Sequence, residues 1–268
     1  MSVFPRRVCV IAAVCLGFCL AGPLAHALIL DWDSVTWTPG SLNNSYDLTG
    51  DAVNDITINI TRRGNGPVFT NDPTTGTLTP TINQTLTGGL SPVENSLMIA
   101  GNLFTNSDVT VQISLTGVYP GAANVSFTIF DIDITTNSDI INTIYGLAPD
   151  GTHVAATITN VGSTINLSGS GLAQTLTGNG PSPDNSGNGN ATISFGAAVI
   201  TDLFFTFSNN AGAPRYQDIA LGDISFSPVP EINPAAASAI SCVLAVGLTV
   251  FTRRRAKLKA HRLHAAQR

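Results

Sequence analysis

The chain has 268 residues, 43% of them hydrophobic, which is enough to build a folded core and excludes a chain that is disordered throughout. Only 11% of the residues are charged, well below the roughly 25% of ordinary soluble proteins. This scarcity of charge argues against a coiled coil and against a typical cytosolic enzyme.

Charge is divided unevenly along the chain. Residues 28–230 contain three Arg, no Lys and sixteen acidic residues, which give this part a net charge of −13. Residues 1–27 carry two Arg and no acid, and residues 231–268 carry seven Lys or Arg and one Glu. A segment this acidic repels phosphates, so we expect no nucleic-acid binding. Short basic ends beside apolar runs are typical of membrane-topology signals.

The N-terminus has the three parts of a secretory signal peptide, which we predict over residues 1–27. Two arginines precede the apolar run 8–20, and Ala25 and Ala27 form a small-x-small cleavage site. Cleavage after passage through the secretion translocon would leave Leu28 as the first residue. A permanent membrane anchor is the alternative interpretation.

Segments of residues 28–227 alternate apolar and polar side chains, as half-buried strands do. Three isoleucines share one face of a predicted strand over residues 56–61. Residues 203–208 alternate in the same way, with Phe204 as the exception. Further predicted strands are 28–37, 97–103, 109–115, 125–134, 140–147, 153–160, 164–168, 191–196 and 219–226.

About eleven such strands, with turn signals between them and no helical pattern before residue 235, predict an all-β fold. We expect an antiparallel β-sandwich of jelly-roll type over residues 28–227. Residues 62–93 and 177–190 have few apolar anchors and are predicted to be long loops. This domain has no cysteine, so its stability must come from sheet packing, alone or with a metal ion.

The aspartates predict a structural calcium site, because Ca²⁺ in proteins is bound by carboxylate, carbonyl and amide oxygens. Asp31 and Asp33 share one face of a predicted strand, and Asp131 and Asp133 repeat this spacing. A last strand beside the first would bring Asp223 to Asp31 or Asp33. Solvated carboxylates that keep the domain soluble are the alternative.

The orientation of Asp223 follows from the alternation of the last predicted strand. Asp223 is in phase with Ile219 and Leu221, so we predict that it points inward unless a bulge at Gly222 resets the phase. An inward carboxylate needs a partner, because burying it alone is costly.

Aromatic rings predict a second kind of site, for carbohydrate. Trp32, Trp37 and Tyr216 are candidate glycan contacts, because sugar sites in β-sandwiches combine exposed rings with Asn, Asp and Gln. The two tryptophans are five residues apart, so an unbroken strand would place them on opposite faces, with one in the core. The alternative is that all these rings pack in the core or at its edge.

Catalytic signatures are weak, and we predict that the protein is not an enzyme. The domain has one histidine, His153, and no nucleophile-elbow motif accompanies it. A zinc site is unsupported because the domain has no cluster of His and Cys. A glycan hydrolase needs two carboxylates, one of them with a raised pKa, and the many aspartates leave this alternative open.

A predicted transmembrane helix lies near the C-terminus. Residues 235–252 are eighteen uncharged, mostly apolar residues, about 27 Å long as a helix, which spans a hydrocarbon core. Arg253, Arg254 and Arg255 follow at once, and residues 256–268 form a basic tail. By the positive-inside rule the tail is cytoplasmic, so the acidic domain faces outward.

The order of Val229, Pro230 and Glu231, an apolar helix and an arginine cluster resembles the PEP-CTERM sorting signal of exopolysaccharide-producing Gram-negative bacteria. The resemblance covers residues 228–255, with the motif at 229–234, where Ile-Asn-Pro replaces the usual immediate second proline. It implies that the chain is a substrate of an exosortase, a membrane processing enzyme. A plain membrane anchor is the alternative.

The middle domain also resembles the β-sandwiches that PEP-CTERM proteins carry, at residues 31–33 and 217–224. This second resemblance implies no activity. We therefore predict an exported cell-surface or extracellular-matrix protein with a non-catalytic, structural role, whose precursor is held in the membrane. A carbohydrate-binding module for exopolysaccharide is the alternative, and a glycan hydrolase is a third possibility.

Overall fold

The structure is a computed structural model that describes residues 26–229, apart from 65–67, 104–106, 116, 118–119, 135 and 211–214. Ala25–Val229 is a compact unit. The predicted signal peptide up to Ala25, the predicted sorting motif from Pro230, the predicted membrane helix and the arginine cluster lie outside the described residues. Within the described part, we find no helix with the length and apolarity needed to cross a membrane.

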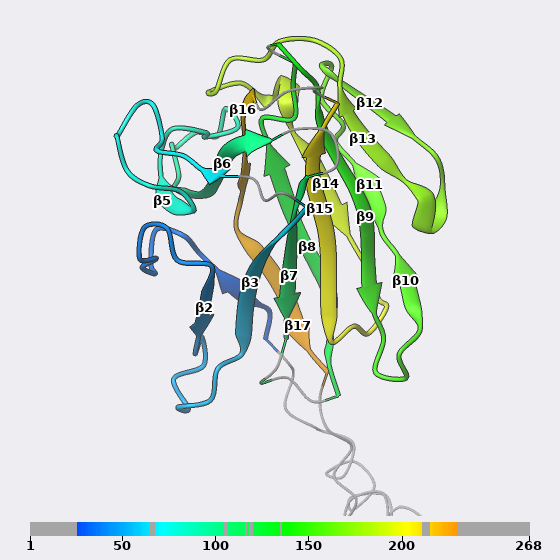
Figure 1. Ribbon diagram of the computed structural model, residues 1–268. Coiled ribbons are helices and arrows are strands. Elements are labelled where there is room, and N and C mark those ends of the chain that lie inside the picture. Colours follow the sequence, from blue (N-terminus) through cyan, green and yellow to red (C-terminus); the bar gives the residue numbers. More distant parts are fainter. Residues whose placement is uncertain are drawn as a thin grey trace, which may run out of the picture. The chain divides into compact units, whose positions relative to one another are not determined.

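Two antiparallel sheets pack against each other in this unit (Figure 1). The predicted all-β sandwich is therefore confirmed. Sheet A has the strand order β1 (Leu28–Leu30), β17 (Ile224–Pro228), β8 (Ala122–Phe130), β16 (Arg215–Leu221), β6 (Ser96–Leu103) and β4 (Val68–Phe69). It also contains β14 (Ala191–Ser194), paired with β8, β11 (Thr157–Thr159), paired with β14, and β5 (Thr81–Asn83), paired with β6.

Among the described residues, sheet B has eight strands, and two short 3₁₀ turns lie in the connections. The main order is β12 (Ile165–Ser168), β13 (Thr175–Gly178), β9 (Asp139–Leu147), β15 (Asp202–Asn209), β7 (Asp108–Ser114), β3 (Ile56–Arg63) and β2 (Asn43–Tyr46). The eighth strand, β10 (His153–Ala155), pairs with β9. The 3₁₀ turns are η1 (Gly171–Ala173) and η2 (Gly187–Gly189).

The core lies between the two sheets and follows the alternation of the sequence. Ile56 and Ile58 on β3 are fully buried, and Phe205 and Phe207 on β15 are equally buried. On sheet A, alternate residues of β8, β14 and β17 point into the same core. On β8, β14 and β17 the other set of side chains faces outward and is mostly polar.

The first predicted strand, 28–37, ends at Leu30 because a turn begins at Asp31. The N–H of Ser34 donates to the carbonyl of Asp31 at 3.1 Å, and the N–H of Asp33 donates to the Asp31 carboxylate at 2.7 Å. These local bonds compete with strand pairing, as Asp side chains commonly do.

Two other predicted strands are shorter than expected. The predicted strand 125–134 ends at Phe130, and Asp131 beyond it has a φ of 64°. The predicted strand 153–160 divides in two, because β10 pairs within sheet B while β11 pairs within sheet A. The chain therefore crosses from one sheet to the other at this point.

A second, smaller hydrophobic cluster lies on the outer side of sheet A. Leu86, from the predicted loop 62–93, is fully buried there beside Met98, Phe130 and Ala220. This packing fixes the loop against the sheet. The loop therefore forms the wall of a groove.

Candidate functional site

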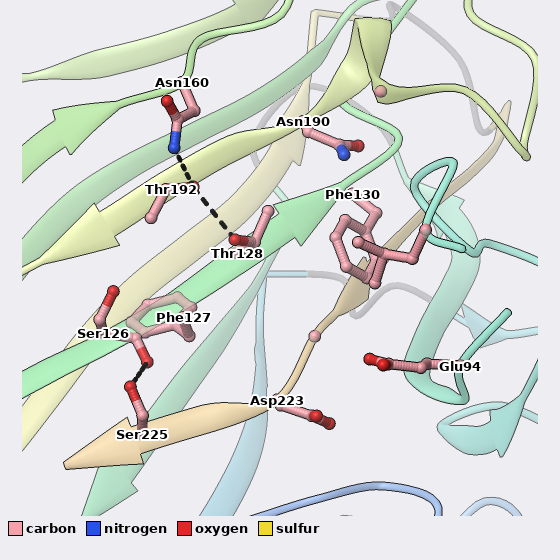
Figure 2. A pocket seen from close by; sticks show the side chains of 13 residues that line it. Glu94, Ser126, Phe127, Thr128, Phe130, Asn160, Asn190, Thr192, Asp223 and Ser225 are labelled. Atoms are coloured by element: carbon pink, nitrogen blue, oxygen red, sulfur yellow. Dashed lines mark hydrogen bonds between the residues drawn. The ribbon is translucent and has the colours of Figure 1, made fainter. Parts of the chain in front are cut away.

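The outer face of sheet A carries a groove of about 470 Å³ (Figure 2). Its floor consists of outward-facing residues of β8, β14 and β17, and its wall is the loop that leads into β6. The uncharged polar side chains that line it are Ser126, Thr128, Asn160, Asn190, Thr192 and Ser225. Hydroxyl and amide groups from four parts of the chain therefore meet in one cavity.

A hydrogen-bonded row orders the floor of the groove (Figure 2). The hydroxyls of Thr128 and Thr192 are 3.1 Å apart across the β8–β14 pair, and the Asn160 amide donates to Thr192 at 3.3 Å. On the neighbouring pair, the Ser225 hydroxyl donates to the carbonyl of Ser126 at 3.4 Å. These bonds hold the polar groups in place before any ligand arrives.

Asn190 joins the floor of the groove to its wall. Its Nδ2 donates to the carbonyl of Gly88 at 2.8 Å. Gly88 has a φ of +59°, and a Cβ added there would lie 2.4 Å from Cδ1 of Phe130. Only glycine therefore combines this backbone conformation with this close approach to the ring.

The groove has an acidic end, formed by Glu94 and Asp223 (Figure 2). Asp223 Oδ1 accepts a hydrogen bond from the N–H of Trp32 at 3.1 Å. Partial burial raises the pKa of the Asp223 carboxyl, and repulsion from Asp31, Glu94 and Asp33 adds to this rise. The first and last strands of the domain, β1 and β17, are paired, and Asp223 lies near Asp31 and Asp33, as the sequence suggested.

Asp223 does not point inward, because the strand is interrupted at Gly222, which is the exception stated in the sequence-based prediction. β16 ends at Leu221 and β17 begins at Ile224, and the N–H of Gly222 between them donates to the carbonyl of Thr128 at 2.9 Å. This break resets the alternation, so Ile224 is buried and the Asp223 side chain lines the groove.

Asp131 and Asp133 lie elsewhere, in a buried group of acids with Asp139 on β9 and Asp218 on β16. The N–H of Asp139 donates to the carbonyl of Asp133 at 3.0 Å, and the N–H of Asp133 donates back to Asp139 Oδ2 at 3.2 Å. Asp133 Oδ2 also accepts from the N–H of Ser182 at 2.8 Å. By contrast, Oδ1 of Asp131 and Oδ1 of Asp139 are buried without a partner.

Burial raises the pKa of each carboxyl in this acidic cluster, which we define as Asp131, Asp133, Asp139 and Asp218. The pKa of Asp131 is raised to about 8, with repulsion from Asp218 as the next cause. The pKa of Asp218 is raised to about 6, and the pKa values of Asp133 and Asp139 are also raised. Burial and mutual repulsion therefore favour the protonated form of Asp131 at neutral pH.

The predicted calcium ligands are thus divided between two places. Asp31, Asp33 and Asp223 lie near the groove, whereas Asp131 and Asp133 belong to the acidic cluster. Across the described residues, no three His, Cys, Asp or Glu side chains are placed to hold one metal ion together. Calcium binding stays a prediction.

Neither tryptophan can contact a glycan, which corrects the prediction for Trp32 and Trp37. Their exposed fractions are 0% and 6%, and their rings pack edge to face with centroids 6.4 Å apart. The strand breaks after Leu30, so the expected placement on opposite faces does not apply. Tyr216 is half-buried on the small outer cluster, and its hydroxyl donates to Asp218 at 3.0 Å.

Three other rings, none of them among the predicted glycan contacts, are stacked on the outer face of sheet B. Tyr145 lies 4.2 Å from His153 and 5.0 Å from Phe204 between ring centroids, at interplanar angles of 15° and 20°. Tyr145 and Phe204 are half-buried and His153 is exposed. The sequence contained one signal for this outward-facing stack: Phe204 is the apolar residue that breaks the alternation of its strand.

No protein-family model matches the chain, and no curated protein matches it either. Among solved structures, it is similar to a family 11 carbohydrate-binding module from Clostridium thermocellum in complex with a β-1,3-1,4-mixed-linked tetrasaccharide. That match has a TM-score of 0.33 and 12% identity, and covers 78% of this chain and 99% of the module. A second structure, the family 11 module of the cellulosomal cellulase Lic26A-Cel5E of Clostridium thermocellum, has a TM-score of 0.31 and 11% identity, with 77% and 97% covered. At these TM-scores the similarity supports no conclusion about a ligand of this chain.

Proposed function

We propose that the chain is an exported cell-surface or matrix protein whose jelly-roll-like β-sandwich binds polysaccharide without cleaving it. The groove of Figure 2 is the observation that carries this proposal. Sugars are recognised through many hydroxyl groups, and the groove offers hydroxyls and amides already fixed by hydrogen bonds. Its volume of about 470 Å³ is within the range of small-molecule sites.

Charge favours a neutral polysaccharide over an acidic one. Residues 28–230 carry a net charge of −13, and two carboxylates, Glu94 and Asp223, stand at one end of the groove. A polyanionic glycan would meet repulsion there. A neutral glycan instead gains acceptors for its hydroxyl groups.

Export is the second part of the proposal. The predicted cleavage site at Ala27 and the predicted sorting motif at Val229, Pro230 and Glu231 both lie at the edges of the compact unit Ala25–Val229. Processing at both places would release the sandwich whole. Mass spectrometry of the protein from culture medium should find termini near Leu28 and within 229–234. Protein that ends at Arg268 in every fraction would contradict exosortase processing.

Affinity electrophoresis of the exported protein tests the binding part. The gels contain an α-glucan, a β-glucan or a galactomannan as neutral polysaccharides, or a polyuronate as the acidic comparison. We expect retardation by at least one neutral polysaccharide, and its loss in Asn190→Ala. Asn166→Ala is the matched control, because Asn166 is exposed on β12 of the other sheet. Migration unchanged by every polysaccharide would overturn the proposal.

A glycan hydrolase is the second candidate, because Glu94 and Asp223 line the same groove and burial raises the pKa of Asp223. In that case reducing ends would accumulate during incubation, and both Glu94→Gln and Asp223→Asn would abolish their release. Binding without new reducing ends supports the non-catalytic function.

A further inference from the structure

The outer face of sheet B presents a row of side chains that crosses the strands. Residues in register on neighbouring strands lie side by side on one face of a sheet. The pairings β2–β3, β3–β7, β7–β15 and β15–β9 therefore align one outward-facing residue from each strand. The members of this row are Asn43, Asn59, Gln112, Phe204 and Tyr145.

One end of the row is aromatic. Tyr145 is stacked between His153 on β10 and Phe204 on β15, so both of its faces are covered. Phe204 has Tyr145 on one side, and its other face is turned toward β7, the next strand, at Gln112. A ring held in this way is a rigid wall against which the apolar face of a sugar can pack.

The middle of the row supplies fixed amides beside this wall. Nε2 of Gln112 donates to Asp202 Oδ1 at 3.0 Å and to the Ser114 hydroxyl at 3.2 Å. The Ser114 hydroxyl in turn donates to Asp202 Oδ1 at 2.5 Å. Asn43 donates through Nδ2 to Oδ1 of Asn59, which leaves Nδ2 of Asn59 to donate to a ligand.

A cavity of about 550 Å³ lies beside this surface, over the next row of residues along the strands. Thr110, Thr206 and Asn142 are aligned there by the same strand pairings and contribute to its lining. Beyond them, Arg63 forms an ion pair with Asp108. The surface therefore combines hydroxyls, amides and one aromatic wall, and its ion pair is neutral overall.

We propose that this surface, the outer face of sheet B around Phe204 and Gln112, is a second binding site for neutral polysaccharide. The inference rests on the proposed function of the groove in sheet A. Because the core separates the inner faces of the two sheets, the two sites lie on opposite sides of one sandwich (Figure 1). One domain then bridges two glycan chains, which is a cross-linking role in a matrix.

Binding and cross-linking are measured separately to test this. The exported protein is added to the α-glucan, the β-glucan or the galactomannan. Affinity electrophoresis measures binding, and light scattering together with viscometry measures cross-linking. We expect scattering and viscosity to rise as wild-type protein is added. Both should fall again at excess protein, because each protein molecule then binds a single glycan chain and no longer bridges two. Phe204→Ala and Gln112→Ala should keep binding through the groove but lose the rise. Asn166→Ala, on the same sheet outside the row, should behave as wild type.

Each result assigns success or failure to one site. Cross-linking that persists in both Phe204→Ala and Gln112→Ala would overturn the second site while leaving the groove intact. Loss of all binding in Gln112→Ala, with a thermal melt like that of wild type, would overturn the groove as an independent site and with it the bridging role. If the Phe204→Ala protein does not fold, the Gln112→Ala protein alone still tests the second site.

Discussion

Asp223 accepts a hydrogen bond from the backbone N–H of Trp32, a residue 191 positions earlier in the chain, at 3.1 Å. This bond ties the segment after β1 to the break between β16 and β17. The same carboxylate lines the groove in sheet A. One side chain therefore links the two ends of the domain and also forms part of the candidate site.

Replacing Asp223 should therefore destabilise the fold. Asp223→Ala leaves the N–H of Trp32 without its acceptor, and a hydrogen bond to a charged group is worth about 1.5–3 kcal/mol. We expect a loss of that size in urea unfolding, and a smaller one for Asp223→Asn, which retains an acceptor oxygen. Asp51→Ala, at an exposed turn, is the control. Equal free energies of unfolding for the Asp223→Ala and Asp51→Ala proteins would show that the hydrogen bond between Asp223 and Trp32 does not stabilise the domain.

Gly88→Ala should disturb the wall of the groove. A Cβ at this position would meet the ring of Phe130 at 2.4 Å, and overpacking of this kind costs about 1–3 kcal/mol. Gly50→Ala is a matched control, because Gly50 also has positive φ but nothing lies within 4 Å of its Cβ position. Chemical denaturation should show a larger loss for Gly88→Ala, together with weaker retardation by polysaccharide. Similar losses for the two variants would contradict the close packing.

Stability should fall as the pH rises, because of the acidic cluster. Its carboxyls have raised pKa values, about 8 for Asp131, so the folded state holds protons that the unfolded state releases above the ordinary Asp pKa of 3.8. The contribution of Asp131 is fully present below about pH 4 and is lost as the pH rises through about 8. In the presence of a chelator, the melting temperature should be higher at pH 5 than at pH 8.

Asp218→Asn provides the internal control for this pH dependence. The amide cannot ionise, and it removes the repulsion from Asp218 that helps to raise the pKa of Asp131. The variant should therefore show a flatter profile and a higher melting temperature at pH 8 than wild type. A wild-type melting temperature that rises from pH 5 to pH 8 would contradict the assignment.

Calcium binding is tested by the same melts at neutral pH. A ligand that binds the folded state alone raises the melting temperature by mass action, so we expect a higher value with excess Ca²⁺ than with a chelator. Loss of that increase in Asp131→Asn would place the ion in the acidic cluster, and loss in Asp33→Asn would place it near Trp32. Identical melting temperatures with Ca²⁺ and with chelator would exclude both positions.

Strand alternation alone was enough to predict the sandwich and its core. The isoleucines of β3 and the alternate residues of β7 are buried as their period of two required. Short strands without alternation, such as β4 (Val68–Phe69) and β5 (Thr81–Asn83), were not predicted, because their pairing with β6 depends on tertiary contacts.

The candidate sites were less predictable because they depend on where strands break. Asp223 faces the groove only because the strand is interrupted at Gly222. The strand expected to place the two tryptophans on opposite faces ends at Leu30, and both rings are buried. The aromatic stack on sheet B depends on the register between β15 and β9. This register places Phe204 opposite Tyr145, although the two residues are 59 positions apart in the sequence. Sequence spacing carries no information on that register.

The most direct measurement is a titration of the ¹⁵N-labelled exported protein with soluble oligosaccharides of the neutral glucans and galactomannan, followed by NMR. The account predicts saturable shifts of the side-chain amide signals of Asn160 and Asn190, with a second set at Asn59 and Gln112. Asn166 should not shift. Spectra that stay unchanged at every sugar concentration, or shifts confined to residues outside both faces, would contradict polysaccharide binding by this domain.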